Sequence, residues 1–119
     1  MQWNPYDRNC PSRRLLDRIG DRWTVLIVGI LAEDGPLRFG ELARRVDGIS
    51  QKMLTQTLRH LERDGLVKRT LYPQVPPRVD YELTAAGHSL RVPLQALEDW
   101  AIANMHHVEA ARDSYDKAG

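Results

Sequence analysis

Hydrophobic positions recur at helical spacing over most of the chain and alternate with polar positions over a short part of it. Helical spacing, with residues that begin or end helices at the borders, predicts five helices over 11–19, 22–32, 40–46, 50–63 and 84–105. Extended structure is expected for a short piece over 37–39 and for two strands over 66–72 and 78–83. The two strands flank the proline-rich loop 73–77, which cannot donate ladder hydrogen bonds at its prolines.

Three of these segments have a distinctive hydrophobic pattern. Helix 22–32 is apolar on nearly every side, so we expect it to be central and buried. Helix 50–63 has one apolar face, with four inward positions expected at Met53, Leu54, Leu58 and Leu61. The returning strand alternates, with inward positions at Val79, Tyr81 and Leu83 and outward positions at Asp80 and Glu82.

The order of elements predicts a mostly helical α+β fold. A short helix, the turn Asp47-Gly48 and a longer helix, followed by a hairpin, form a winged helix-turn-helix. We expect one domain over 1–119, with a core over about 10–105, an N-terminal arm over 1–9 and a polar, fraying tail over about 108–119. Pro93 is expected to bend the last helix.

Charge supports a polyanion partner for the middle of the chain. The net charge of +1 combines a neutral N-terminal part with a basic segment over 38–78 and an acidic segment over 79–119. The basic segment holds nine Arg or Lys residues against four Asp or Glu residues. Such a segment can present one basic face to nucleic acid, although charge runs also serve only to solvate a surface.

The outward face of helix 50–63 carries the side chains that could bind DNA. Gln can pair with adenine through two hydrogen bonds, and Arg or Lys with guanine. A solvated amphipathic helix is the alternative, because polar faces are common. The position of this helix, after a short helix and before a hairpin, favours DNA recognition.

Several stretches of the sequence together resemble the HxlR-type regulators, a winged helix-turn-helix family of bacteria related to MarR-like and ArsR-like regulators. The resemblance covers about residues 10–104, and the combination of stretches in this order is specific. The stretches that carry it are Cys10-Pro11, Ile19-Gly20-Asp21-Arg22-Trp23-Thr24, Gly35-Pro36-Leu37-Arg38-Phe39-Gly40-Glu41-Leu42, Ile49-Ser50-Gln51-Lys52-Met53-Leu54-Thr55, Leu61-Glu62-Arg63-Asp64-Gly65-Leu66-Val67 and the wing from Tyr72 to Thr84.

The resemblance implies a dimeric, cytoplasmic transcription regulator, either a repressor or an activator, that binds double-stranded DNA. A dimer with two recognition helices is expected to bind a near-palindromic site. It places the DNA-binding residues on helix 50–63 and on the wing. Arg38, in the short extended piece, completes our expected set, which is Ser50, Gln51, Lys52, Thr55, Gln56, Arg59, Arg78 and Arg38. Arg78 adjoins the prolines of the wing. Because these prolines keep the wing stiff, Arg78 would lose little entropy on reaching DNA. An ordinary charge at the end of a strand is the alternative.

Cys10 is the chain's single cysteine and directly precedes Pro11 at the start of the first helix. The helix dipole and the nearby Arg8, Arg13 and Arg14 favour the thiolate, which is the reactive form. Some HxlR-type regulators sense quinones, aldehydes or oxidants through a cysteine at this position. Cys10 is thus a candidate sensor that could form a thiol adduct or a disulfide between two chains. A cysteine that only caps the helix or packs is the alternative.

The last helix repeats apolar residues along one seam. Because a short domain has few other faces to cover that seam, we expect it to join two copies of the chain, together with the first helix. A lid over the protein's own core is the alternative. The expected interface residues are Leu15, Leu90, Leu94, Leu97, Trp100 and Ala101, with Met105 continuing the seam.

Other functions find little support in the sequence. The four histidines lack partners at ligand spacing, and we expect no metal, no cofactor and no enzymatic activity. No apolar run is long enough to cross a bilayer, and no signal peptide precedes the domain, so we expect a cytoplasmic protein. Two alternatives to a DNA-binding regulator are a winged-helix module that binds only proteins, and a redox or small-molecule-binding protein without DNA.

Overall fold

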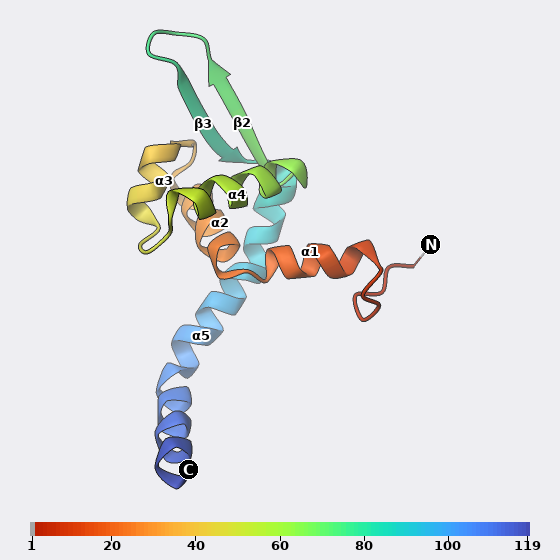
Figure 1. Cartoon of the computed structure of the whole chain (residues 1–119), viewed down its shortest axis with the longest axis vertical. Helices are drawn as coiled ribbons and strands as arrows, with labels where there is room; N and C mark the ends of the chain where they lie inside the picture. The colour runs from red at the N-terminus through yellow and green to blue at the C-terminus, as the bar shows by residue number, and fades with distance from the viewer. Residues whose placement is uncertain (1) are drawn as a thin grey trace.

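The computed structural model describes residues 2–119 and contains five helices and one three-stranded sheet in that part of the chain (Figure 1). In chain order these elements are α1 (Pro11–Ile19), α2 (Arg22–Asp34), β1 (Leu37–Arg38), α3 (Phe39–Arg45), α4 (Gln51–Arg63), β2 (Val67–Tyr72), β3 (Arg78–Leu83) and α5 (Ala85–Ala118). This order confirms the α+β winged helix-turn-helix expected from the hydrophobic pattern.

The helix borders follow from the capping residues in the sequence. Asp21 caps α2, since its carboxylate accepts a hydrogen bond from the Trp23 amide at 3.2 Å. Ser50 caps α4 in the same way through the Met53 amide at 3.0 Å, and Thr84 caps α5 through the Gly87 amide at 3.1 Å. Each cap satisfies an amide that lacks a partner inside its helix.

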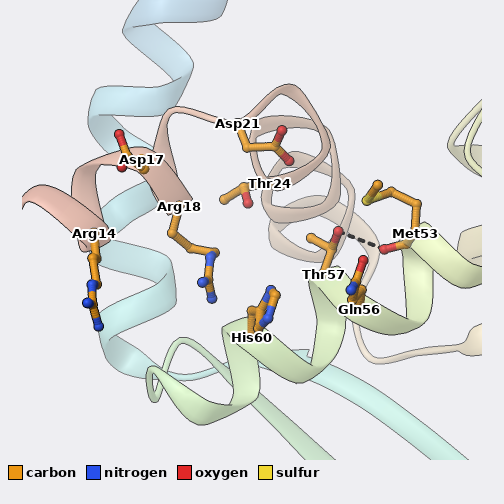
Figure 2. Close-up of a pocket in the computed structure, with 9 residues that line it drawn as sticks. All are labelled: Arg14, Asp17, Arg18, Asp21, Thr24, Met53, Gln56, Thr57 and His60. Atoms are coloured by element: carbon orange, nitrogen blue, oxygen red, sulfur yellow. Dashed lines mark hydrogen bonds between the residues drawn. The ribbon is translucent and has the colours of Figure 1, made fainter.

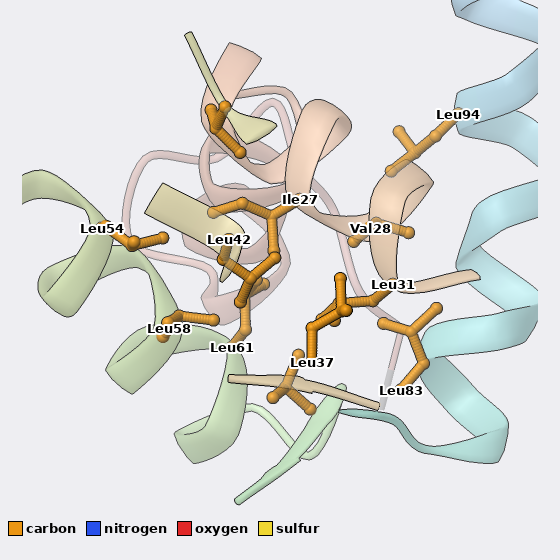
Figure 3. Packing of buried hydrophobic residues seen from close by; sticks show 12 residues of the cluster. Ile27, Val28, Leu31, Leu37, Leu42, Leu54, Leu58, Leu61, Leu83 and Leu94 are labelled. Carbon is orange, nitrogen blue, oxygen red and sulfur yellow. The ribbon is translucent and has the colours of Figure 1, made fainter. Parts of the chain in front are cut away.

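The hydrophobic core lies where α2, α3 and α4 meet the sheet and the first turns of α5 (Figure 3). α2 supplies three of the most buried side chains, and α4 supplies three others from its inner face. The buried apolar residues are Ile27, Val28, Leu31, Leu37, Leu42, Val46, Leu54, Leu58, Leu61, Val67, Leu83 and Leu94. α2 is nevertheless not buried on every side as expected, because Leu26 on its other face is 42% exposed.

The sheet has the order β1-β3-β2, with both pairs antiparallel. β2 and β3 form the wing, with Val67 opposite Leu83 at its base and Tyr72 opposite Arg78 near its tip. The expected alternation in β3 is wrong at Asp80, which is only 5% exposed because β1 adds a third strand beside it. A strand covered on both edges can bury a carboxylate when a cation compensates its charge.

The last helix is longer than expected and remains helical to Ala118, so the expected end near residue 105 is wrong. α5 continues through Pro93, and its only buried residues, Gly87 and Leu94, lie in its first three turns. Beyond them the helix projects away from the rest of the protein (Figure 1). Among residues 2–119, nothing therefore buries a residue of its C-terminal part, which lacks the tertiary packing that stabilises most helices.

Candidate nucleic-acid interface

The helix-turn-helix consists of α3, a short turn and α4. The turn passes through Gly48, whose φ of +87° lies in the left-handed region that favours glycine. Leu42, Val46, Leu54 and Leu58 are buried in one hydrophobic core cluster, so this shared core holds both helices in place. The outward face of α4 is thereby held in one orientation.

Five of the six predicted α4 residues gather on one outward surface. Thr55 is half-buried at its centre, and the others are exposed around a shallow hollow lined by Gln51, Lys52, Thr55, Gln56 and Arg59. Ser50, the sixth, is exposed, but its hydroxyl is occupied as the N-cap of α4. We name the five-residue surface the α4 outer face. Its amides, ammonium and guanidinium provide hydrogen-bond donors and positive charge on one side of a helix.

Met53 does not belong to the core, although the periodicity of α4 placed it there. Its side chain is 38% exposed and borders a cavity between α4 and the first two helices. Thr57 takes the inward position instead and is 5% exposed, with its hydroxyl donating to the Met53 carbonyl at 2.8 Å. A threonine can face inward in a helix because this bond satisfies its hydroxyl.

A second basic surface lies beside the wing. Arg38, Arg44 and Arg78 come from the end of β1, from α3 and from the start of β3, and they line one hollow. We name these three residues the wing arginines. Arg44 was not among the predicted site residues, and its only signal in the sequence was membership of the basic segment.

Arg78 is held in place by the buried carboxylate of Asp80. Its Nε and Nη2 atoms donate to the two carboxylate oxygens at 2.9 and 3.0 Å, and its guanidinium lies 5.4 Å from the Tyr72 ring centre. The Asp80 hydrogen bond raises the pKa of Arg78, and the same hydrogen bond from Arg78 lowers the pKa of Asp80. The side chain is 41% exposed, so Arg78 is a pre-oriented cation rather than a flexible one.

Cys10 lies at the N-cap of α1 and is half-buried. Its Sγ atom is 3.1 Å from the Ser12 hydroxyl, and it accepts a hydrogen bond from the Asn4 amide at 3.3 Å. The hydrogen bond with the Ser12 side chain, followed by those with the Asn4 and Ser12 backbone, lowers the pKa of the thiol, while the charge of Asp7 opposes this. The expected cause was different, since Arg13 instead donates to the Pro5 and Tyr6 carbonyls.

The predicted interface residues separate into two groups. Leu94 is 5% exposed and belongs to the core, and Leu90 packs against that core. The first part of the seam therefore covers the protein's own core, which was the alternative expectation. Leu97 and Trp100 are 53% and 61% exposed, and Ala101 is exposed beside them. On α1, Leu15 is 45% exposed.

Two other features bear on the class of protein. Among residues 2–119, no three His, Cys, Asp or Glu side chains gather where they could hold a metal ion. In the same part of the chain, no helix combines the length and the apolar character needed to cross a membrane.

A helix pair with a polar and basic outer helix, followed by a two-stranded wing, defines a winged helix-turn-helix protein. The chain belongs to the HxlR-like helix-turn-helix family, whose model matches residues 18–109. It is similar to YtfH of Escherichia coli (strain K12), an uncharacterized HTH-type transcriptional regulator, with 44% identity over 110 residues that cover 92% of this chain and 86% of that one. The protein is therefore a transcriptional regulator of the helix-turn-helix type, and neither its family nor its relatives are enzymes.

Solved structures show the same fold. One is the structure of ytfH from Salmonella typhimurium, which is named as a transcriptional regulator. Its sequence is 43% identical to this chain and its TM-score is 0.87, and the match covers 94% of this chain and 99% of that one. The redox regulator HypR in its oxidized form is 40% identical with a TM-score of 0.72, covering 80% of this chain and 97% of that one.

Proposed function

We propose that the protein binds specific double-stranded DNA sequences as a homodimer and that Cys10 makes this binding responsive to electrophiles or oxidants. The observation that carries the first part is the α4 outer face. It collects two glutamines, a threonine and two cations on the exposed side of a helix whose other side is locked into the core. Bases in the major groove are recognised by such side chains when a rigid helix presents them.

The wing arginines supply contacts of a different kind. Arg78 is oriented by Asp80, and Arg38 and Arg44 line the same hollow, so three cations converge beside the helix-turn-helix. Cations in such a position neutralise phosphates and fix the register of the protein on the duplex without reading its sequence. Sequence specificity on this view comes from α4, and much of the affinity comes from the wing arginines.

The projecting part of α5 supports the homodimer. Beyond Leu94 this helix has no buried residue, yet it carries Leu97, Trp100, Ile102 and Met105 with at least 40% exposure each. Leu15 and Leu16 of α1 are similarly exposed. A single chain rarely exposes so much large apolar surface on helices that lack other support, so a second copy is the expected cover.

Cys10 is suited to sensing by its hydrogen bonds and by its place on α1. A thiol with a lowered pKa forms more thiolate, which attacks electrophiles and is oxidised. Because α1 carries exposed apolar residues expected at the interface, an adduct or a disulfide between two chains there would change how the protomers meet. The spacing of two recognition helices, roughly 34–36 Å in such dimers, would change with it. The similar protein HypR is named as a redox regulator.

A module that binds only other proteins is the competing function. Its interface would be depleted in charge at the centre, whereas the α4 outer face has Lys52 and Arg59 beside its glutamines. The experiment is recovery of bound fragments from genomic DNA of the source cell, followed by titration of the recovered site. A variant with Gln51, Lys52, Gln56 and Arg78 all changed to alanine should lose the site while keeping its helical circular dichroism. Full affinity in that folded variant would contradict the proposed surface.

A further inference from the structure

A cavity lies behind the α4 outer face, between α4 and the first two helices (Figure 2). α1 contributes Arg18, α2 contributes Thr24, and α4 contributes Met53, Gln56, Thr57 and His60. These four α4 residues follow one another at positions i, i+3, i+4 and i+7, so they form one continuous stripe of that helix. The cavity is thus built by the side of α4 next to its DNA-facing side.

Two hydrogen-bond donors in this cavity lack a partner. The Thr24 side chain is 0% exposed, and its hydroxyl has no hydrogen-bond partner among residues 2–119. The Nη1 atom of Arg18 is also buried without such a partner, because its nearest carboxylate oxygen, on Asp64, is 3.6 Å away. An unpaired buried donor destabilises a protein, so two of them facing one cavity call for an occupant.

The donors define the chemistry of that occupant. Figure 2 shows the Arg18 guanidinium and the Thr24 hydroxyl turned toward the same space, and Asp17 and Asp21 also line the cavity. One cationic and one neutral donor match the two oxygens of a single carboxylate. A dianion such as a phosphate ester would fit less well, because Asp64 already adds a negative charge beside Arg18.

The remaining walls favour an apolar body on the ligand. The exposed Met53 side chain borders the cavity and offers a polarisable, adaptable contact to a ring. The Thr57 hydroxyl is committed to the Met53 carbonyl, so it adds no further free donor.

We propose that this cavity binds a small aromatic or aliphatic carboxylate and that its occupancy lowers the affinity of the protein for DNA. The second half rests on the proposed DNA-binding function. Gln56 links the two sites, because it lines both this cavity and the hollow of the α4 outer face. A ligand that draws Gln56 toward the cavity removes it from the DNA surface, and DNA binding must then oppose ligand binding equally.

Binding can be tested without DNA by titrating the full chain with benzoate and recording amide ¹H–¹⁵N NMR spectra. We expect saturable shifts in α4 and at the start of α2. Benzamide, the neutral counterpart, should bind at least about tenfold more weakly, as expected when a charge-assisted hydrogen bond is lost.

Two variants and one control locate the site. Thr24→Val and Arg18→Gln should each weaken benzoate binding by about tenfold, whereas Arg112→Gln, which removes the same charge from the projecting part of α5, should leave it unchanged. Thr24→Val removes an unpaired hydroxyl and keeps the side-chain shape, so its melting temperature should not fall. Absence of saturable shifts, equal binding of benzamide, or unchanged binding in the two folded variants would overturn the site.

Coupling to DNA is a separate measurement. Benzoate should weaken binding to the recovered DNA site in the wild type and not in Thr24→Val. Unchanged DNA affinity with benzoate bound would overturn the coupling alone. A protein that takes up benzoate but binds no DNA would contradict the proposed function and leave the carboxylate site standing.

Discussion

Lys52 provides the most direct quantitative test of DNA binding. It lies in the first turn of α4 on the α4 outer face, is exposed and forms no ion pair with another residue of 2–119. A lysine that neutralises one phosphate contributes about 0.9 to the slope of log K against log salt concentration. A homodimer places two copies on the site, so Lys52→Ala should reduce this slope by about 1.8.

The slope converts into a measurable difference in affinity. A change of about 1.8 means that, between about 50 and 200 mM salt, the wild type loses roughly twelvefold more affinity than Lys52→Ala. Fluorescence anisotropy with a labelled copy of the recovered site measures both slopes. Lys117→Ala is the matched control, because it removes the same charge from the last turn of α5. Gln51→Ala should keep the wild-type slope and change the sequence preference instead.

Two outcomes would refute this reasoning. Equal slopes for Lys52→Ala and Lys117→Ala would mean that the α4 outer face does not meet phosphates. A reduction of about 0.9 rather than about 1.8 would mean that only one recognition helix of the pair engages the duplex.

Two further predictions concern the dimer and the thiol. Leu97→Glu should shift the protein toward monomer in sedimentation while it stays folded, whereas Leu94→Glu should unfold it, because a charge would enter the core; an unchanged dimer in a folded Leu97→Glu would contradict the α5 interface. Treatment with a quinone, an aldehyde or hypochlorite should lower the DNA affinity of the wild type and not of Cys10→Ser, and any disulfide should double the mass on a non-reducing gel. The thiolate that reacts becomes scarcer as the pH falls through the lowered pKa of Cys10, so the wild-type rate should fall in the same range. The same response in both proteins would assign Cys10 a structural role.

Much of the helix-turn-helix could be predicted from local sequence. Asp21, Ser50 and Thr84 cap the helices where expected, and each cap bond spans only two or three residues. The α4 outer face follows in the same way, since assigning its apolar positions to the core leaves Gln51, Lys52, Thr55, Gln56 and Arg59 on the other side.

The departures occur where contacts come from distant parts of the chain. Asp80 alternates outward in the sequence, yet β1 covers its strand and Arg78 compensates its charge. Met53 and Thr57 exchange their expected environments, because a cavity rather than core lies beside that edge of α4. Hydrophobic periodicity and residue propensity determine which face of an element is apolar, but they do not determine what packs against the edges of that face.

The last helix and the two buried hydrogen-bond donors show most clearly which features depend on contacts from distant parts of the chain. Hydrophobic periodicity predicts an apolar seam along α5 but does not divide it, because burial of Leu94 and exposure of Leu97 depend on where α2 ends its contact with α5. Nothing local marks Thr24 as a group without a partner, since most threonines near a helix start satisfy their hydroxyl nearby. Only the tertiary structure, by bringing α1, α2 and α4 together, leaves that hydroxyl and the Arg18 guanidinium facing one cavity.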